Sequence, residues 1–302
     1  MNSVELENDK FNSELSTLLK TKLFPAGKTS ADPTMVFYPD HEGWLTKTDQ
    51  ILTEKYPLAI NRQLFNFNKE KFMKLKASTD KKFILKKIDN AILKNIGKKI
   101  LEDIKISWIS EERFLERGVG FVLLQDDKLI SSCHSCFANG EAYEISVNTY
   151  QDRFRKKGYA TAVTVKFIDY CLENEIEPKW ECWEGNTSSE RLAEKLGFEK
   201  KSLYPVQFVL LNEIDEYMEN AFYYRFKLKK YQESAEFFEK AFDLMDEIDP
   251  KNLYACSCSF ALAGNRDKAF DYLHRAIEMG FDPKQVENKA LLDLMQNNND
   301  PI

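Results

Sequence analysis

Leucines at helical spacing lie near the start of the chain, and apolar segments separated by turn residues follow them. Leu15, Leu18, Leu19 and Leu23 share one helical face, which predicts an N-terminal helix. Pro and Gly divide the next segments, whose mixed periods predict a small α/β subdomain. We therefore expect residues 1–107 to hold both parts, with a strand over 35–38, a helix over 43–55 and apolar-alternating segments over 60–67 and 82–88.

The alternation is clearest from residue 108 to residue 212. Apolar runs at 120–124 and 129–136 flank four polar residues, as the strands of a hairpin do. Tyr143–Thr149 alternates as a third strand and places Glu144, Ser146 and Asn148 on one face. We expect a helix from Gly158, a strand over 179–184, a second helix and a last strand over 208–211. This order predicts an α/β domain.

The second helix of this domain has start and stop signals. Thr187 with Glu190 three residues later fits a capping box, and Gly197 after Leu196 fits a helix end. These signals predict that the helix begins near residue 187.

The last section, residues 213–302, has only helical patterns. Asp249-Pro250 is matched by Asp282-Pro283, and apolar and small residues from Tyr231 onward are matched 35 residues later from Arg266 onward. A period in the mid-thirties is typical of stacked helical hairpins, and Gly264-Asn265 suits a turn between helices. This section resembles the tetratricopeptide repeat. The alternative is a helical bundle without repeat ancestry.

Composition and charge narrow the function classes. Of 302 residues, 43 % are hydrophobic and 30 % charged, as in ordinary folded chains. The net charge of −6 argues against general binding to nucleic acids or anionic membranes. No apolar run reaches the ~18–20 residues that span a bilayer, and the N-terminus lacks the pattern of a signal peptide. We therefore expect a cytoplasmic protein.

The six cysteines are expected to be reduced. Cys133-His134-Ser135-Cys136 offers a zinc alternative, since two thiolates at this spacing can chelate the metal. A structural zinc site needs four ligands, and no second Cys or His pair has a matching spacing. Cys256 and Cys258 lie far away in another kind of segment. We expect buried thiols on a strand, and no metal.

One short motif points to chemistry. It lies between the predicted strand and helix and consists of Arg155, Lys156, Lys157, Gly158, Tyr159 and Ala160. Gly and Ala leave room over an anion, backbone N–H groups point inward, and the start of the helix adds a positive dipole end. The motif predicts a cradle for a diphosphate.

With its flanks, this motif resembles the GNAT superfamily of acetyl-CoA-dependent N-acetyltransferases. Arg155, Gly158 and Ala160 match the family's first motif, and Asn186, Ser189 and the pair Gly197-Phe198 match its second. The resemblance covers about residues 108–212. Further residues, such as Glu112-Arg113-Phe114, look like a bacterial subgroup with an extra N-terminal α/β portion. The implied fold is α/β (α+β), with a mixed sheet flanked by helices.

The resemblance implies which residues bind acetyl-CoA. The backbone from Arg155 to Ala160 would hold the diphosphate, with Arg155 and Lys157 adding charge. A splayed strand end formed by Val147, Asn148 and Thr149 would bind pantetheine and polarise the thioester carbonyl. Asn186, with Ser189 in the same motif, would contact the pantetheine arm. Alternatively, Asn186 only caps its helix.

The catalytic groups are less defined. An amine must lose a proton before attack, and Glu144 lies where several family members carry the base. Glu181 and Glu184 are alternates, and Glu144 could also be a plain exposed strand residue. Many members have a tyrosine acid where this chain has Ala193. Tyr159, Tyr143 or solvent could replace it.

The resulting hypothesis is an N-acetyltransferase that moves an acetyl group directly to a primary amine of a small molecule or protein. The C-terminal helices could bind a protein partner or a second copy. The alternative is a catalytically weak or inactive acyl-CoA-binding module. The sequence does not identify the acceptor amine.

Overall fold

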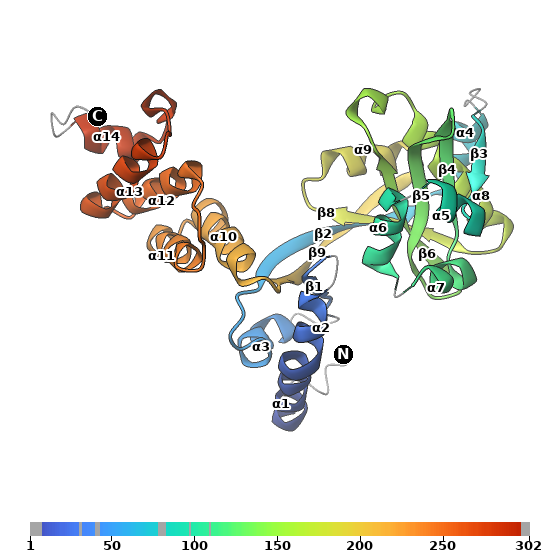
Figure 1. Cartoon of the computed structure of the whole chain (residues 1–302). Coiled ribbons are helices and arrows are strands. Elements are labelled where there is room, and N and C mark those ends of the chain that lie inside the picture. The colour runs from blue at the N-terminus through green and yellow to red at the C-terminus, as the bar shows by residue number, and fades with distance from the viewer. Residues whose placement is uncertain are drawn as a thin grey trace. The chain divides into compact units, whose positions relative to one another are not determined.

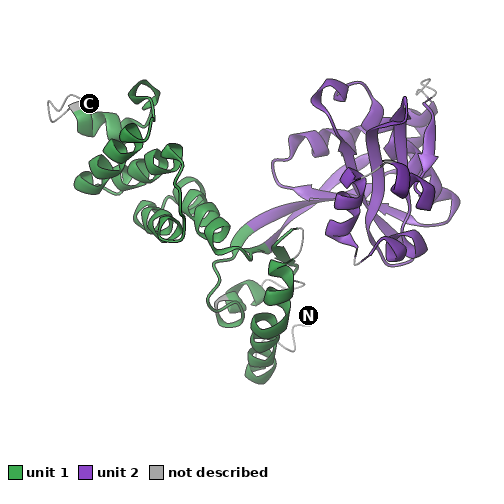
Figure 2. Ribbon diagram, viewed as in Figure 1, with its two compact units in different colours: residues 1–59, 207–302 green, residues 60–206 purple. Residues whose placement is uncertain are grey.

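The computed structural model describes residues 8–29, 32–39, 43–77, 83–96, 98–108 and 110–296, which divide between two units (Figures 1 and 2). One unit spans residues 60–206, and the other joins residues 1–59 to 207–302. These bounds differ from the three sections of the sequence because strand β2, in the predicted N-terminal section, pairs with β8. The three domains remain a prediction.

A five-stranded sheet in the order β3-β4-β5-β6-β7 lies in the unit 60–206. Neighbouring strands are antiparallel, except that β6 and β7 are parallel. The predicted hairpin at 125–128 is confirmed, and Asp126 and Asp127 both adopt positive φ in its turn. The strands are β3 (Leu85–Lys87), β4 (Gly120–Gln125), β5 (Lys128–Ala138), β6 (Ala142–Thr149) and β7 (Glu177–Lys179).

Apolar side chains cover both faces of this sheet. Phe121 and Leu123 of β4 join the core that contains Phe167 of the long helix α8, whereas Val122 joins the core that contains Phe114. Neighbouring strand residues point to opposite faces, so the two cores lie on opposite sides. The helices involved are α5 (Asn90–Ile96), α6 (Lys98–Ser107), α7 (Glu111–Arg117) and α8 (Tyr159–Glu173).

A second sheet corrects two strand predictions. The predicted strand 179–184 is divided, because the chain leaves β6 after β7 and residues Glu181–Trp183 form β8 beside β2 (Leu58–Phe67). The predicted strand 208–211 is the end of β9 (Phe198–Leu210). Its first half is polar and exposed, which hid it in the sequence. Strand β2 lies between β8 and β9.

The predicted capping box of the helix α9 (Thr187–Lys195) is wrong by one residue. Asn186 is the N-cap, and its side chain accepts a hydrogen bond from the Ser189 N–H at 3.1 Å. Thr187 is already helical, and Glu190 instead pairs with Lys200 at 2.7 Å. The helix ends as predicted, with Gly197 at a φ of 90°.

Gly197 is the position in this unit where we expect alanine to be most damaging to stability. A Cβ there would lie 2.7 Å from the Phe72 backbone N and 2.9 Å from the Asn68 carbonyl oxygen. Because backbone atoms cannot rotate away, Gly197→Ala adds a clash to the ~1–2 kcal/mol strain of a left-handed residue. We expect the free energy of unfolding to fall by about 3 kcal/mol or more in urea denaturation.

Gly185 is the matched control for this substitution. Its φ is 83°, and a Cβ would meet no described atom within 4 Å beyond those of its chain neighbours. Gly185→Ala should therefore cost only the conformational strain, on the order of 1 kcal/mol. Equal losses in the two variants would contradict the packing argument.

The other unit is mostly helical. Its N-terminal helices and β1 (Thr34–Phe37) pack around Leu19, Trp44 and Val209, and β1 pairs with the end of β9. The predicted helices of the last section are confirmed, and α11 and α13 begin at Tyr231 and Arg266. The elements are α1 (Asp9–Leu18), η2 (Leu19–Leu23), α2 (Phe24–Lys28), α3 (Gly43–Ile51), α10 (Glu213–Tyr223), η4 (Tyr224–Leu228), α11 (Tyr231–Phe242), α12 (Pro250–Leu262), α13 (Arg266–Glu278), η5 (Pro283–Gln285) and α14 (Lys289–Gln296).

Gly264 makes the predicted turn between α12 and α13, with a φ of 80°. Among the described residues, no helix is long and apolar enough to cross a membrane.

Candidate active site

The loop between β6 and α8 presents backbone amides at the start of a helix. Gly158 is the N-cap of α8 with a φ of 87°, and among the described side chains none caps this helix. The first N–H groups of an α-helix lack acceptors within the helix, so this turn can donate to a ligand. The positive end of the helix dipole favours an anion there. Beyond Gly158 and its two chain neighbours, no atom of the described residues lies within 4 Å of where a Gly158 Cβ would be.

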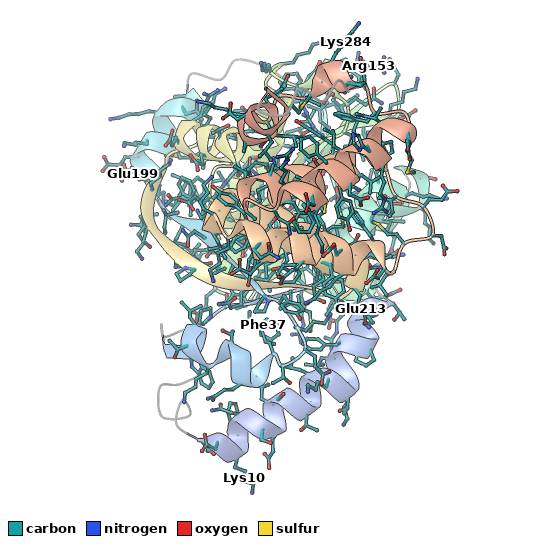
Figure 3. All side chains as sticks on the ribbon, turned by 90° about the vertical axis from the view of Figure 1, so that its left-hand side faces the viewer. Lys10, Phe37, Arg153, Glu199, Glu213 and Lys284 are labelled. Carbon is teal, nitrogen blue, oxygen red and sulfur yellow. The ribbon has the colours of Figure 1, made fainter. Side chains whose placement is uncertain are left out.

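Basic side chains gather at this loop. Arg155, Lys156 and Lys157 are exposed, and Arg155 pairs with exposed Asp152 at 3.1 Å. The Arg153 guanidinium, labelled in Figure 3, lies over the Phe154 ring with 4.7 Å between its carbon and the ring centroid. These residues can place several positive charges around one small anion.

Helix α9 adds another cation to the start of α8. Lys195 Nζ donates to Thr161 Oγ1 at 3.3 Å, in the first turn of α8. A cation at a helix N-terminus is opposed by the helix dipole, and an anion bound beside it would relieve that repulsion. The residues present therefore fit a diphosphate group.

Strands β6 and β7 separate at the candidate site. They pair only through Ala142–Glu144, with Glu144 opposite Lys179, and the next residues of the chain pair with β2 instead. On its other edge, β6 pairs with β5 as far as Thr149. Residues 145–149 thus have an edge of the strand with no partner strand among the described residues. The splayed strand end expected at Val147–Thr149 is thus the part of β6 beyond its separation from β7.

Four polar residues meet where the strands separate, and we call Arg62, Glu144, Glu181 and Tyr204 the Arg62 cluster. Arg62 Nη2 lies 3.0 Å from Glu144 Oε1 and 3.5 Å from Glu181 Oε2. The Tyr204 hydroxyl donates to Glu181 Oε2. The members come from β2, β6, β8 and β9. With both carboxyl groups ionised, the cluster holds one excess negative charge.

Burial shifts the proton affinity of this cluster. The side chains of Arg62, Glu144 and Glu181 are only 11 %, 24 % and 20 % exposed. Burial raises the pKa of Glu144, and the nearby Glu181 raises it further, while the Arg62 guanidinium opposes both effects. Burial also raises the pKa of Tyr204. A carboxylate with a raised pKa is a better general base than an ordinary surface glutamate.

Comparison with known proteins identifies the family. A family model for GNAT acetyltransferases matches residues 7–207, about two thirds of the chain.

The chain belongs to the GNAT acetyltransferase family.

Members of this family use acetyl-CoA. An uncharacterized N-acetyltransferase of Bacillus subtilis (strain 168), YdfB, is 31 % identical over 149 residues, which are 49 % of this chain and 56 % of that protein. The alignment thus spans about half the length of this curated relative.

Solved structures of GNAT proteins also resemble this chain. A GCN5-related N-acetyltransferase-like protein from Streptococcus suis 89/1591 is 24 % identical, with a TM-score of 0.47, covering 58 % of this chain and 70 % of that one. A GCN5-related N-acetyltransferase from Kribbella flavida is 13 % identical, with a TM-score of 0.43 and coverages of 66 % and 75 %.

The residues predicted to bind pantetheine in this GNAT chain lie on the splayed strand. The Asn148 side chain donates to Asp103 Oδ2 of α6 at 2.9 Å, and Thr149 Oγ1 lies 3.2 Å from Ser131 Oγ. Val147 is half-buried against the core beside α8. Since both polar side chains are engaged within the protein, the backbone is what this strand offers to a ligand. The ligand contacts remain predictions.

The second family motif has a structural role in this chain. The Asn186 side chain caps α9, which was the alternative to ligand contact, and Ser189 Oγ accepts from Trp180 Nε1 at 3.1 Å. Asn186 is exposed, so its side-chain amide can still reach a ligand. Glu184, an alternate base, is exposed and accepts from Asn61 Nδ2 at 3.0 Å, outside the Arg62 cluster.

The structure shows the surroundings of each candidate for the general acid and adds a further tyrosine. Ala193, at the family's tyrosine position, is fully buried. Tyr143 donates to the Arg117 carbonyl at 2.9 Å, and Tyr159 packs its ring against Phe83 and Phe154. Tyr204, in the Arg62 cluster, is a tyrosine that the motifs did not indicate.

The cysteine segment lies on β5 as expected. Burial raises the pKa of Cys136 to about 12 and that of Cys133 well above its usual value, so both thiols are protonated at neutral pH. Burial also lowers the pKa of His134 to about 4. In the described ranges, no three or more His, Cys, Asp or Glu side chains are placed to hold a metal ion.

Three residues of the site were missed in the sequence: Arg62, Tyr204 and Lys195. Arg62 and Tyr204 lie outside the two family motifs, and only strand pairing brings Arg62 to Glu144 and Tyr204 to Glu181. Lys195 comes directly before Leu196 and Gly197, which marked the helix end in the sequence. The available signal for Lys195 was a positive residue at the last position of α9.

Proposed function

We propose that this protein is an N-acetyltransferase that moves an acetyl group from acetyl-CoA directly to a primary amine of a small molecule or protein. One observation carries the proposal. Strand β6 connects two parts of the site. The partly buried carboxylate of Glu144 lies where β6 separates from β7, and the start of α8, which no described side chain caps, follows the other end of β6. The first suits a reacting amine, and the second suits a diphosphate.

The chain's own residues have distinct tasks in this proposal. The amides of Gly158–Thr161, with Arg155, Lys157 and Lys195, hold the diphosphate. The unpaired edge of β6 at 145–149 binds the pantetheine arm, and an N–H on that edge polarises the thioester carbonyl. These contacts fix the position of the acetyl group relative to Glu144.

Glu144 takes the proton that the amine must lose. The amine nitrogen then forms a bond to the carbonyl carbon of the thioester, and the carbon–sulfur bond breaks. The products are an amide and CoA thiolate, which takes a proton from solvent, since a thiol with a pKa near 8.5 is a tolerable leaving group without an acid. The buried Ala193 therefore does not forbid turnover.

Thiol release tests this function directly. The purified full chain is mixed with acetyl-CoA and, in turn, with alkylamines, aminoglycosides and lysine-containing peptides, and free CoA is measured with a thiol reagent. We expect amine-dependent release with at least one class, together with an acetylated amine detected by mass spectrometry. Tight acetyl-CoA binding without release for every class would overturn the enzyme in favour of an acyl-CoA-binding module.

The helical section 213–302 has a separate proposed role. Its successive helices α10–α14 support a tetratricopeptide-like arrangement that binds a protein partner or a second copy of the chain. We also propose that the protein is cytoplasmic and that it belongs to a bacterial subgroup of the family with an extra N-terminal portion. Acetyl-CoA is the proposed co-substrate, with no metal.

A further inference from the structure

The cation of the Arg62 cluster comes from outside the segment that resembles the family's motifs. Arg62 lies on β2, opposite Trp183 of β8 in the strand register. From there its guanidinium reaches both carboxylates, at 3.0 and 3.5 Å. The strand that completes the second sheet thus also brings a positive charge to Glu144.

The guanidinium is held from several directions. Its carbon lies 4.8 Å from the centroid of the Trp183 ring, a cation–π contact. Its Nη2 contacts both carboxylates, and the Tyr204 hydroxyl donates to Glu181 in turn. A side chain fixed in this way is preorganised, whereas exposed arginines sample many rotamers.

Glu144 and Glu181 contact the same guanidinium, so their negative charges repel each other when both are ionised. Like charges in a poorly solvated site raise each other's pKa, and a guanidinium beside them lowers it. For Glu144, burial and the charge of Glu181 raise the pKa, and the Arg62 guanidinium lowers it. Removing the guanidinium should raise the pKa of Glu144 further, and a protonated Glu144 cannot accept a proton from an amine.

The other charged and titratable groups facing Glu144 do not replace Arg62. Cys136 of β5 donates from Sγ to the Glu144 carbonyl oxygen at 3.5 Å, and burial keeps this thiol neutral. Lys179 of β7 lies opposite Glu144 in the ladder, but its Nζ binds Glu177 at 2.6 Å. Glu181 of β8 adds negative charge. Within the described part of the chain, Arg62 is the cation that pairs with Glu144.

We propose that Arg62 is a positioning residue for acetyl transfer, which keeps Glu144 ionised and oriented by bridging it to Glu181. This inference rests on the proposed function, in which Glu144 is the base. The bridge sets the lower pH limit of the reaction. The single negative charge left on the cluster also favours acceptors that arrive as ammonium ions.

The pH profile of kcat/KM for the amine tests the proposal. In Arg62→Gln the pKa of Glu144 rises, so the acidic limb should move up by about one pH unit or more, with activity near pH 6 falling about tenfold or more. Arg62→Lys keeps the positive charge, so most of this shift should be absent in that variant. Glu181→Gln removes a like charge and should move the limb the opposite way, to lower pH.

Controls separate positioning from folding and from failure of the proposed function. Arg113→Gln removes an exposed arginine of α7 and should leave the profile unchanged. A uniform loss of activity at every pH, without a shift of the limb, would overturn the proposal.

If the wild-type chain shows no turnover, carbon-13 NMR titration of labelled glutamates still decides the question. Glu144→Gln first assigns the Glu144 signal. An unchanged Glu144 pKa in Arg62→Gln refutes the inference independently of the enzyme.

Discussion

Replacing Gly158 with aspartate should lower kcat/KM for acetyl-CoA on the order of 10³-fold. The glycine has a φ of 87° and precedes the uncapped first turn of α8. An aspartate adds a negative charge beside the diphosphate, which costs about 4 kcal/mol at 4 Å and an effective dielectric constant near 20. It also adds the strain of a left-handed residue. Thiol release and acetyl-CoA titration calorimetry measure the loss.

Gly140→Asp is the matched control. Gly140 also has a positive φ, of 91°, with open space around its Cβ position, and it lies before β6 rather than after it. The variant carries the same charge and the same conformational strain at the other end of the strand. Similar losses in the two variants, or unchanged acetyl-CoA affinity in Gly158→Asp, would show that the loop does not hold the diphosphate.

Glu144→Gln should lower kcat on the order of 10²- to 10⁴-fold, the usual contribution of a general base. The amide keeps the size of the side chain and can still accept a hydrogen bond from Arg62, but it cannot take a proton. Because the ionised form of Glu144 creates the acidic limb of the pH profile, that limb should disappear in the variant. Steady-state rates from pH 6 to pH 9 measure both effects.

A glutamate on the adjoining strand provides the comparison. Glu177 of β7 is exposed and pairs with Lys179, so Glu177→Gln should keep nearly full activity. Acetyl-CoA affinity should stay unchanged in both variants. A loss below threefold in Glu144→Gln would exclude this residue as the base.

The sequence predicted those parts of the site that are local in the chain. The loop at 155–160 contains its own turn glycine and helix start, so six consecutive residues determine its conformation. Asn186 was also correctly placed at the start of α9, although the capping box was assigned one residue too late. In each case the interacting groups lie within a few residues of each other.

The remainder depends on pairing between distant strands. Arg62 reaches Glu181 only because β2 pairs with β8, and Tyr204 reaches it only because β9 begins ten residues earlier than its apolar pattern indicated. No periodicity within a strand encodes its partner. The sequence does not show that the predicted strand 179–184 is divided at Trp180, for the same reason. Its two parts, the end of β7 and β8, differ in the strand they pair with and not in composition.

Strand β2 has a consequence for how the protein is made. In its register Arg62 lies opposite Trp183, so the ribosome must add about 120 further residues before β2 can pair. During this time both edges of β2 lack partners, which exposes the nascent chain to wrong pairing. Contacts of such long sequence separation also slow folding. The charge balance around Glu144 therefore cannot form until β8 has been made, and a chain whose translation stops before β8 cannot acquire it.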